Sequence, residues 1–162
     1  MVKKLVYLFL ALLLPIGVFL FLRAFGKNEF SIPVYYETEM PEYPASCHLI
    51  HKIPYTVPDA ILRGAGWQGE SAALFIADTS PEVLKNMKHL DEEFTSFEVQ
   101  KIYPHQDTTR WDSWCTCFFF LKKPWSVVLI DSERKIRGFY APKSREEMDR
   151  LTVELKILLK QY

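Results

Sequence analysis

An uninterrupted apolar run extends from Leu5 to Leu22 near the start of the chain and contains 18 uncharged residues. Lys3 and Lys4 precede it and Arg23 follows it. Because a bilayer is crossed by about 20 apolar residues, this run predicts a transmembrane helix. A cleaved signal peptide is the alternative, but no A-x-A pattern follows the run, so we expect an anchor that is retained.

Residues 28–60 show no sustained helical period. They are rich in proline and in aromatic residues, which are Pro33, Pro41, Pro44, Pro54 and Pro58 together with Phe30, Tyr35, Tyr36, Tyr43 and Tyr55. Proline interrupts both helices and central strands. We therefore expect this segment to be an extended, ordered lead-in to the folded domain.

The first strongly patterned elements follow it. The continuous apolar run from Ser71 to Ala77 predicts a strand that is buried on both faces of a sheet. Ser80 and Pro81 suit the first turn of a helix, and apolar residues recur at helical spacing as far as Phe94. This order predicts a strand that leads directly into a helix.

The remainder of the chain predicts three more segments with a strand pattern, a hairpin strand and a last helix. Their ranges are Phe97–Tyr103, Cys115–Leu121, Trp125–Asp131, Lys135–Tyr140 and Ser144–Gln161. The whole order indicates an α/β, thioredoxin-like domain with one N-terminal transmembrane helix. We divide the chain into an anchor (1–27), a lead-in (28–60) and the thioredoxin-like domain (61–162).

The distribution of charged residues predicts how the chain is oriented in the membrane. The 162 residues hold 20 Lys and Arg against 20 Asp and Glu, which excludes the strongly basic surface of a nucleic-acid binder. Residues 1–27 carry four basic and no acidic side chains, whereas residues 28–162 carry 16 basic and 20 acidic ones. The basic start favours an N-terminus in the cytoplasm, with the bilayer as a partner and the domain on the periplasmic side of the inner membrane.

The three cysteines leave several alternatives open. In an oxidising compartment they could form a disulfide, and their odd number leaves one thiol over. A strand would place Cys115 and Cys117 on one face, where they could hold a soft metal or simply be buried in the core. Cys47, His48 and His51 could join them as ligands of zinc or copper, and a disulfide between Cys47 and one C-x-C sulfur is an equal alternative.

The stretch VVLIDSERKIRGFY at residues 127–140, followed by a helix that starts with Arg145 to Met148, resembles the C-terminal third of the SCO/SenC family. The YTVPD segment at 55–59 and the helix that begins with Pro81 are also similar to that family. The resemblance implies a membrane-anchored, thioredoxin-like protein that serves the copper centre of cytochrome oxidase.

The family binds copper through a C-P-x-x-C-P motif and a histidine, and the resemblance places these three ligand positions on Ser80, Leu84 and Lys123. Copper(I) prefers thiolates and accepts imidazole, whereas hydroxyl, alkyl and ammonium groups are poor ligands. Without thiolates these positions cannot exchange disulfides either. We expect the three residues to meet in space at a degenerate copper site that binds no metal, with copper elsewhere as the alternative.

Other catalytic motifs, including a P-loop, a G-x-S-x-G elbow and a zinc-protease helix, are absent from the sequence. We therefore expect no enzyme activity, no cofactor, no small-molecule substrate and no nucleic acid. The predicted function is a binding, assembly or structural module of a membrane complex, with a respiratory oxidase implied by the resemblance. The alternative is an atypical copper chaperone or thiol-redox protein that uses Cys47, Cys115 or Cys117.

Overall fold

The computed structural model describes residues 2–25, 31–47, 51–94, 98–104 and 108–160. By contacts between its residues the chain divides into two compact units, Met1–Phe30 and Ser31–Tyr162.

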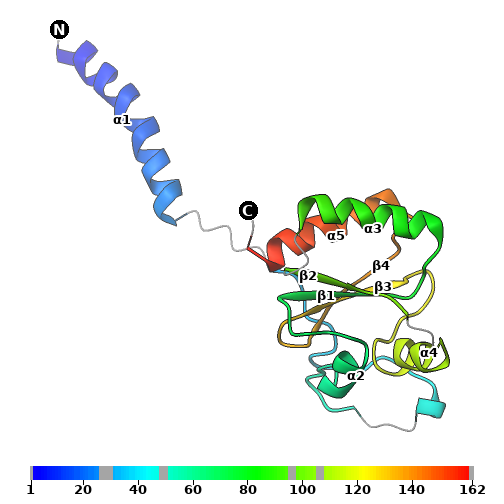
Figure 1. The fold of residues 1–162 in the computed structure, drawn as a ribbon. Coiled ribbons are helices and arrows are strands. Elements are labelled where there is room, and N and C mark those ends of the chain that lie inside the picture. The colour runs from blue at the N-terminus through cyan, green and yellow to red at the C-terminus, as the bar shows by residue number, and fades with distance from the viewer. Residues whose placement is uncertain (1, 26–30, 48–50, 95–97, 105–107, 161–162) are drawn as a thin grey trace. The chain divides into compact units, whose positions relative to one another are not determined.

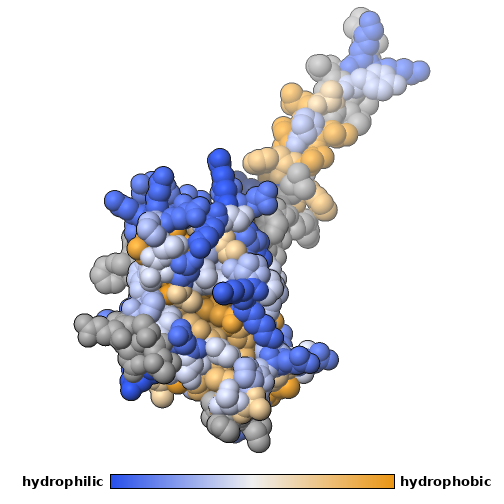
Figure 2. Space-filling model, turned by 90° about the vertical axis from the view of Figure 1, so that its right-hand side faces the viewer, coloured by the Kyte–Doolittle hydropathy of each residue, from blue (hydrophilic) through white to orange (hydrophobic). Residues whose placement is uncertain are grey.

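The first unit is built on the helix α1 (Val2–Phe25), which has Pro15 in its interior. Many of its apolar side chains are exposed, and Figure 2 shows apolar residues along it. Among the described residues, however, no helix combines the length and the apolar character that crossing a bilayer requires. The prediction of a transmembrane helix at Leu5–Leu22 is corrected accordingly: the segment is helical, and a membrane span is not assigned to it.

The second unit contains a mixed sheet with the strand order β2-β1-β3-β4. Its strands are β1 (Ala72–Ile76), β2 (Val99–Ile102), β3 (Val127–Asp131) and β4 (Ile136–Tyr140). β1 pairs with β2 in parallel and with β3 in antiparallel orientation, and β3 and β4 form the predicted hairpin. The mixed α/β class is therefore confirmed, and the first strand lies inside the sheet as predicted.

Helices cover both faces of this sheet (Figure 1). α3 (Pro81–Glu93) and α5 (Arg145–Leu158) lie on one face, while α2 (Asp59–Gly64) and α4 (Thr108–Cys117) lie on the other. This arrangement produces two hydrophobic clusters, one on each side of the strands.

Alternate residues of the central strands enter the two clusters. Leu74 and Leu129 pack with Leu151 on the side of α3 and α5. Phe75 packs on the opposite side with Trp111 of α4. Since both faces are covered, every residue of β1 is buried, which explains why its sequence is continuously apolar.

The predicted strand at Cys115–Leu121 is wrong. Its first residues belong to α4, which ends at Cys117, and no regular element is assigned from Phe119 to Leu121. The side chains of Trp111, Trp114 and Cys115 have the spacing of one helix face, and all three contribute to the same cluster. Burial of this face against the sheet stabilises the helix in place of the strand.

The lead-in is part of the second unit from Ser31 onward. The Tyr35 N–H donates a hydrogen bond of 2.9 Å to the carbonyl oxygen of Ile136 in β4. Further along, the N–H groups of Tyr55 and Val57 donate to the carbonyl oxygens of Tyr36 and Arg134. Its described residues are not extended throughout, because they include a turn at Tyr35–Tyr36, the 3₁₀ turn Ala45–Cys47 and the start of α2 at Asp59. Tyr35, Tyr36 and Tyr55 pack in the same cluster as Ile136 and Phe139 of β4.

Candidate functional site

Two of the three family ligand positions lie at the start of α3. Ser80 occupies the N-cap position, but its hydroxyl makes no capping hydrogen bond and is buried without a partner. Its N–H instead donates to the carboxylate of Asp78 at 2.8 Å. Leu84, one turn later, is 42% exposed. Ser80 therefore lies at the predicted N-cap position, but its side chain does not accept the hydrogen bond that a capping residue usually accepts from the first turn.

The third position, Lys123, lies in the loop before β3 and is exposed. That loop neighbours the start of α3 because the Ala77 N–H donates to the carbonyl oxygen of Ser126 at 2.7 Å. Within the described ranges, no hydrogen bond or ion pair joins the side chains of Ser80, Leu84 and Lys123. The direct meeting of these three side chains stays a prediction.

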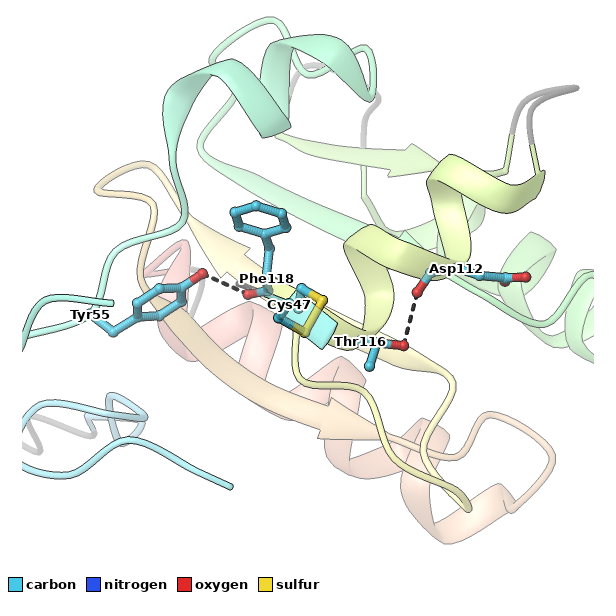
Figure 3. Close-up of a disulfide and its surroundings, with 6 residues drawn as sticks. Cys47, Tyr55, Asp112, Thr116 and Phe118 are labelled. Carbon is cyan, nitrogen blue, oxygen red and sulfur yellow. Dashed lines mark hydrogen bonds between the residues drawn. A yellow bond between two sulfur atoms is a disulfide. The ribbon is translucent and has the colours of Figure 1, made fainter. Parts of the chain in front are cut away.

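Cys47 and Cys117 form a disulfide that links the lead-in to the end of α4 (Figure 3). This is one of the two pairings that the sequence left open. Residues two apart on a helix differ by about 200° in direction, so Cys115 and Cys117 do not share a face. The prediction of a C-x-C pair on one side of a strand is therefore wrong, and Cys115 remains a free, buried thiol.

The remaining thiol is in an environment that suppresses its reactivity. Burial, with a smaller contribution from Asp112, raises the pKa of Cys115 to about 12. Near neutral pH the group is therefore protonated, whereas both nucleophilic attack and metal binding need the thiolate. Among the described residues no group of three His, Cys, Asp or Glu side chains is placed to hold a metal ion, and His48 lies outside them.

His51 packs as an aromatic ring in this structure. Its imidazole contacts the rings of Tyr43, Tyr55, Phe118 and Phe120, with centroids 5.1–5.8 Å away. Desolvation lowers the pKa of His51, against a smaller opposing effect of a backbone hydrogen bond at Cys117. The Nε2 atom is buried without a hydrogen-bond partner. The neutral imidazole is thus the form that this environment favours.

A hydrogen bond reinforces the link that the disulfide makes. The hydroxyl of Tyr55 donates to the carbonyl oxygen of Phe118 at 2.8 Å, next to the disulfide (Figure 3). Burial raises the pKa of Tyr55 far above its ordinary value, so the hydroxyl stays a donor at neutral pH. The lead-in and the segment after α4 are therefore held together both covalently and by hydrogen bonding.

These two segments, together with β4 and α5, line a cleft of about 480 Å³, which we call the aromatic cleft. It is lined by Tyr35, Tyr36 and Pro41 of the lead-in, by Phe120, Lys122 and Trp125 of the loop before β3, by Phe139 of β4, and by Glu147 and Arg150 of α5. A volume of this size suits a small ligand or one or two side chains of a partner. Trp125 is 44% exposed, so the cleft presents an indole ring to solvent.

The aromatic rings of the cleft contact one another. Tyr36 meets Phe120 at a centroid distance of 5.2 Å, and Tyr35 meets Phe139 at 5.1 Å. Trp125 lies 6.1 Å from Phe139 on the other side. Tyr36 and Phe120 also have positive φ angles of 63° and 52°, which are unfavourable for residues other than glycine. Strained backbone of this kind concentrates at ligand clamps and active sites.

The two basic residues of the cleft differ in whether they are paired with an acidic residue. Arg150 is paired with Glu147 at 2.8 Å, donates to the carbonyl oxygen of Phe139 and stands over the ring of Tyr140. Lys122, by contrast, is exposed and has no ion pair with another described residue. One positive charge is therefore available at the rim.

Sequence reasoning did not find the aromatic cleft. Its residues come from four parts of the chain, and no local period connects them. The available signals were the Tyr35-Tyr36 pair within a proline-rich segment and the position of Trp125 in a polar loop. Neither pattern says which distant segment it will face.

Comparisons of the chain with protein families, with curated proteins and with solved structures find no match. They neither support nor oppose the resemblance to the SCO/SenC family. The features of the structure that bear on function are the disulfide, the buried thiol and the aromatic cleft.

Proposed function

We propose that the second unit, Ser31–Tyr162, is a non-catalytic binding module that holds a segment of a partner protein in the aromatic cleft. The observation that carries this proposal is the cleft itself, with five aromatic rings and a partly exposed Trp125. Aromatic side chains are enriched at the centres of protein interfaces because they bury a large area at a low cost in conformational entropy.

The strain in the cleft supports the same proposal. Tyr36 and Phe120 each adopt a left-handed backbone conformation that costs about 1–2 kcal/mol. A function that needs their rings in the wall of a cleft would explain residues other than glycine at these positions. The disulfide and the Tyr55 hydrogen bond supply the rigidity that holds the walls in place.

The chemistry of the cysteines favours binding over redox or copper transfer. Two sulfurs are bonded to each other, and the third is buried with its pKa raised to about 12. An atypical copper chaperone or thiol-redox protein would need an accessible thiolate at neutral pH. Assembly of a respiratory oxidase is the setting that the sequence resemblance implies for such a module.

Site-specific photo-crosslinking tests the proposal. We would place p-benzoylphenylalanine at position 125 of the full chain in cells and irradiate. The same amino acid at position 84 is the matched control, because Leu84 and Trp125 are similarly exposed at 42% and 44%. A partner that crosslinks from 125 and not from 84, and whose purified form binds the protein but not Trp125→Ala, is the expected result. Equal crosslinking at the two positions, or none at either, would overturn the proposal.

A further inference from the structure

The charge distribution around the aromatic cleft indicates what kind of segment it accepts. Residues 28–162 carry more acidic than basic side chains, 20 against 16. The cleft departs from this excess, since two of its three charged lining residues, Lys122 and Arg150, are basic. The lining thus carries one net positive charge in a unit whose overall charge is negative.

Only one of these charges is free to pair with a ligand. Glu147 neutralises Arg150, and the Arg150 guanidinium is further occupied by the Phe139 carbonyl oxygen. The Lys122 ammonium has no such partner among the described residues, and Lys122 lines the cleft together with Phe120 and Trp125. A ligand that places an apolar group on the rings can therefore place an anion on Lys122.

The Tyr36 hydroxyl does not oppose an anion. Burial raises the pKa of Tyr36 to about 12, so this phenol is neutral near pH 7. The negative charge in the lining is confined to Glu147, which Arg150 holds at 2.8 Å. The cleft thus combines an aromatic wall with an unopposed cation.

We propose that the aromatic cleft selects an acidic peptide segment, in which an aromatic or large apolar side chain enters the cleft and an adjacent carboxylate pairs with Lys122. This inference rests on the proposed function, and it specifies the chemistry of the partner. A basic or neutral segment with the same aromatic residue binds less well, because it leaves the Lys122 ammonium repelled or unpaired.

Fluorine NMR of the full chain labelled with 5-fluorotryptophan tests the inference. The resonance of Trp125 is assigned with Trp125→Phe, and it is titrated with three capped peptides, Gly-Asp-Phe-Asp-Gly, Gly-Asn-Phe-Asn-Gly and Gly-Lys-Phe-Lys-Gly. We expect the acidic peptide to shift this resonance and to bind about two- to five-fold more tightly than the Asn peptide, as for a partly exposed ion pair. The Lys peptide should bind most weakly.

Two neighbouring lysines provide a matched pair of variants. Lys122→Gln should abolish the preference for the acidic peptide and leave the affinity for the Asn peptide unchanged. Lys123→Gln removes the same charge one residue away, outside the cleft lining, and should retain the preference. Equal affinities for the three peptides, or a preference that survives Lys122→Gln, would overturn the inference.

A separate arm distinguishes a peptide from a small carboxylic acid. If 3-phenylpropionate shifts the Trp125 resonance with the affinity of the acidic peptide, the occupant is a small acid and the inference of a peptide is wrong. The proposed function is tested independently by crosslinking. Suppose that a partner crosslinks only from position 125 but its binding segment lacks acidic residues. This result would contradict the inference of an acidic peptide and would still support the proposed function.

Discussion

Tyr36 and Phe120 make an edge-to-face contact in the wall of the aromatic cleft with their ring centroids 5.2 Å apart, and both have positive φ angles. One residue lies in the lead-in and the other follows α4. The Cys47–Cys117 disulfide joins the lead-in to the last residue of α4, just before the segment that holds Phe120. The strained backbone, the ring contact and the covalent link therefore coincide at one place in the fold.

The contact between these rings should be measurable as a coupling. In a double-mutant cycle, Tyr36→Ala and Phe120→Ala should show an interaction free energy of about 0.5–1.5 kcal/mol by urea unfolding. Alanine has the same difficulty with a positive φ as the residue that it replaces, so the backbone strain is unchanged. The coupling therefore measures the interaction between the two rings. Tyr36→Ala combined with Leu84→Ala is the control pair, because Leu84 lies on α3, and its effects should add. A coupling of zero for the first pair would contradict the contact.

Loss of the disulfide should destabilise the domain substantially. The two cysteines are separated by 70 residues, and a loop of that length is worth about 4 kcal/mol in the chain-entropy model. We expect Cys47→Ala/Cys117→Ala to lower the free energy of unfolding by about 2–4 kcal/mol. Dithiothreitol should lower the stability of the wild type similarly and leave the double variant unchanged. A reductant effect of the same size on both proteins would show that another group is responsible.

The buried thiol should make stability depend on alkaline pH. Cys115 has a pKa of about 12 in the folded protein against 9.0 for the exposed thiol. Below pH 9 both states are protonated, whereas above it the unfolded chain loses the proton first, so stability should fall as pH rises from about 9 to 12. Cys115→Ala should show a smaller loss between about pH 8 and pH 10.5 in urea titrations. The thiol should also resist iodoacetamide at about pH 8 until urea unfolds the domain. Rapid alkylation of the folded protein would refute the assignment.

His51 should make stability depend on acid pH. Its pKa is lowered in the folded protein from the ordinary value of 6.5. As pH falls below 6.5, the unfolded chain binds a proton that the folded protein resists, so the free energy of unfolding should decrease. His51→Gln should weaken this decrease between about pH 7.5 and pH 5. An imidazole titration by NMR above the ordinary pKa would contradict the prediction.

The resemblance to the SCO/SenC family makes its own prediction. Ser80→Cys, Leu84→Cys and Lys123→His together should create copper(I) binding, measured by competition with bicinchoninate under reducing conditions, because thiolate and imidazole are suitable ligands. The matched control carries Ser80→Cys and Lys123→His but keeps Leu84, and it should bind copper far more weakly. Equal binding by the two variants, or by the unmodified protein, would contradict the degenerate-site hypothesis.

Elements with one clear period could be predicted from the sequence. The strand at Ser71–Ala77 and the helix that begins at Pro81 are found with bounds shifted by one residue. The segment that contains α4 was misassigned because the apolar run that follows Ser113 suits either a buried strand or a buried helix. Burial of Trp111 and Trp114 against the sheet decided for the helix.

The candidate site could also be predicted only in part from the sequence. A disulfide that includes Cys47 was among the alternatives that residue types allow, but the choice of Cys117 over Cys115 depends on the direction of each side chain on α4. A helix turns by about 100° per residue, so this direction changes with the element type. The aromatic cleft was not predicted because its rings come from separated segments.

By itself the sequence determined a mixed α/β domain with a buried central strand, one-sided helices and a surplus thiol. Local hydrogen bonding and the burial of one face act over a few residues, so they leave a period that can be read along the chain. The tertiary structure alone decided that Cys47 meets Cys117 and that Tyr36 meets Phe120. Those contacts depend on which distant segments the sheet brings together. A pattern of neighbouring residues carries no information about that pairing.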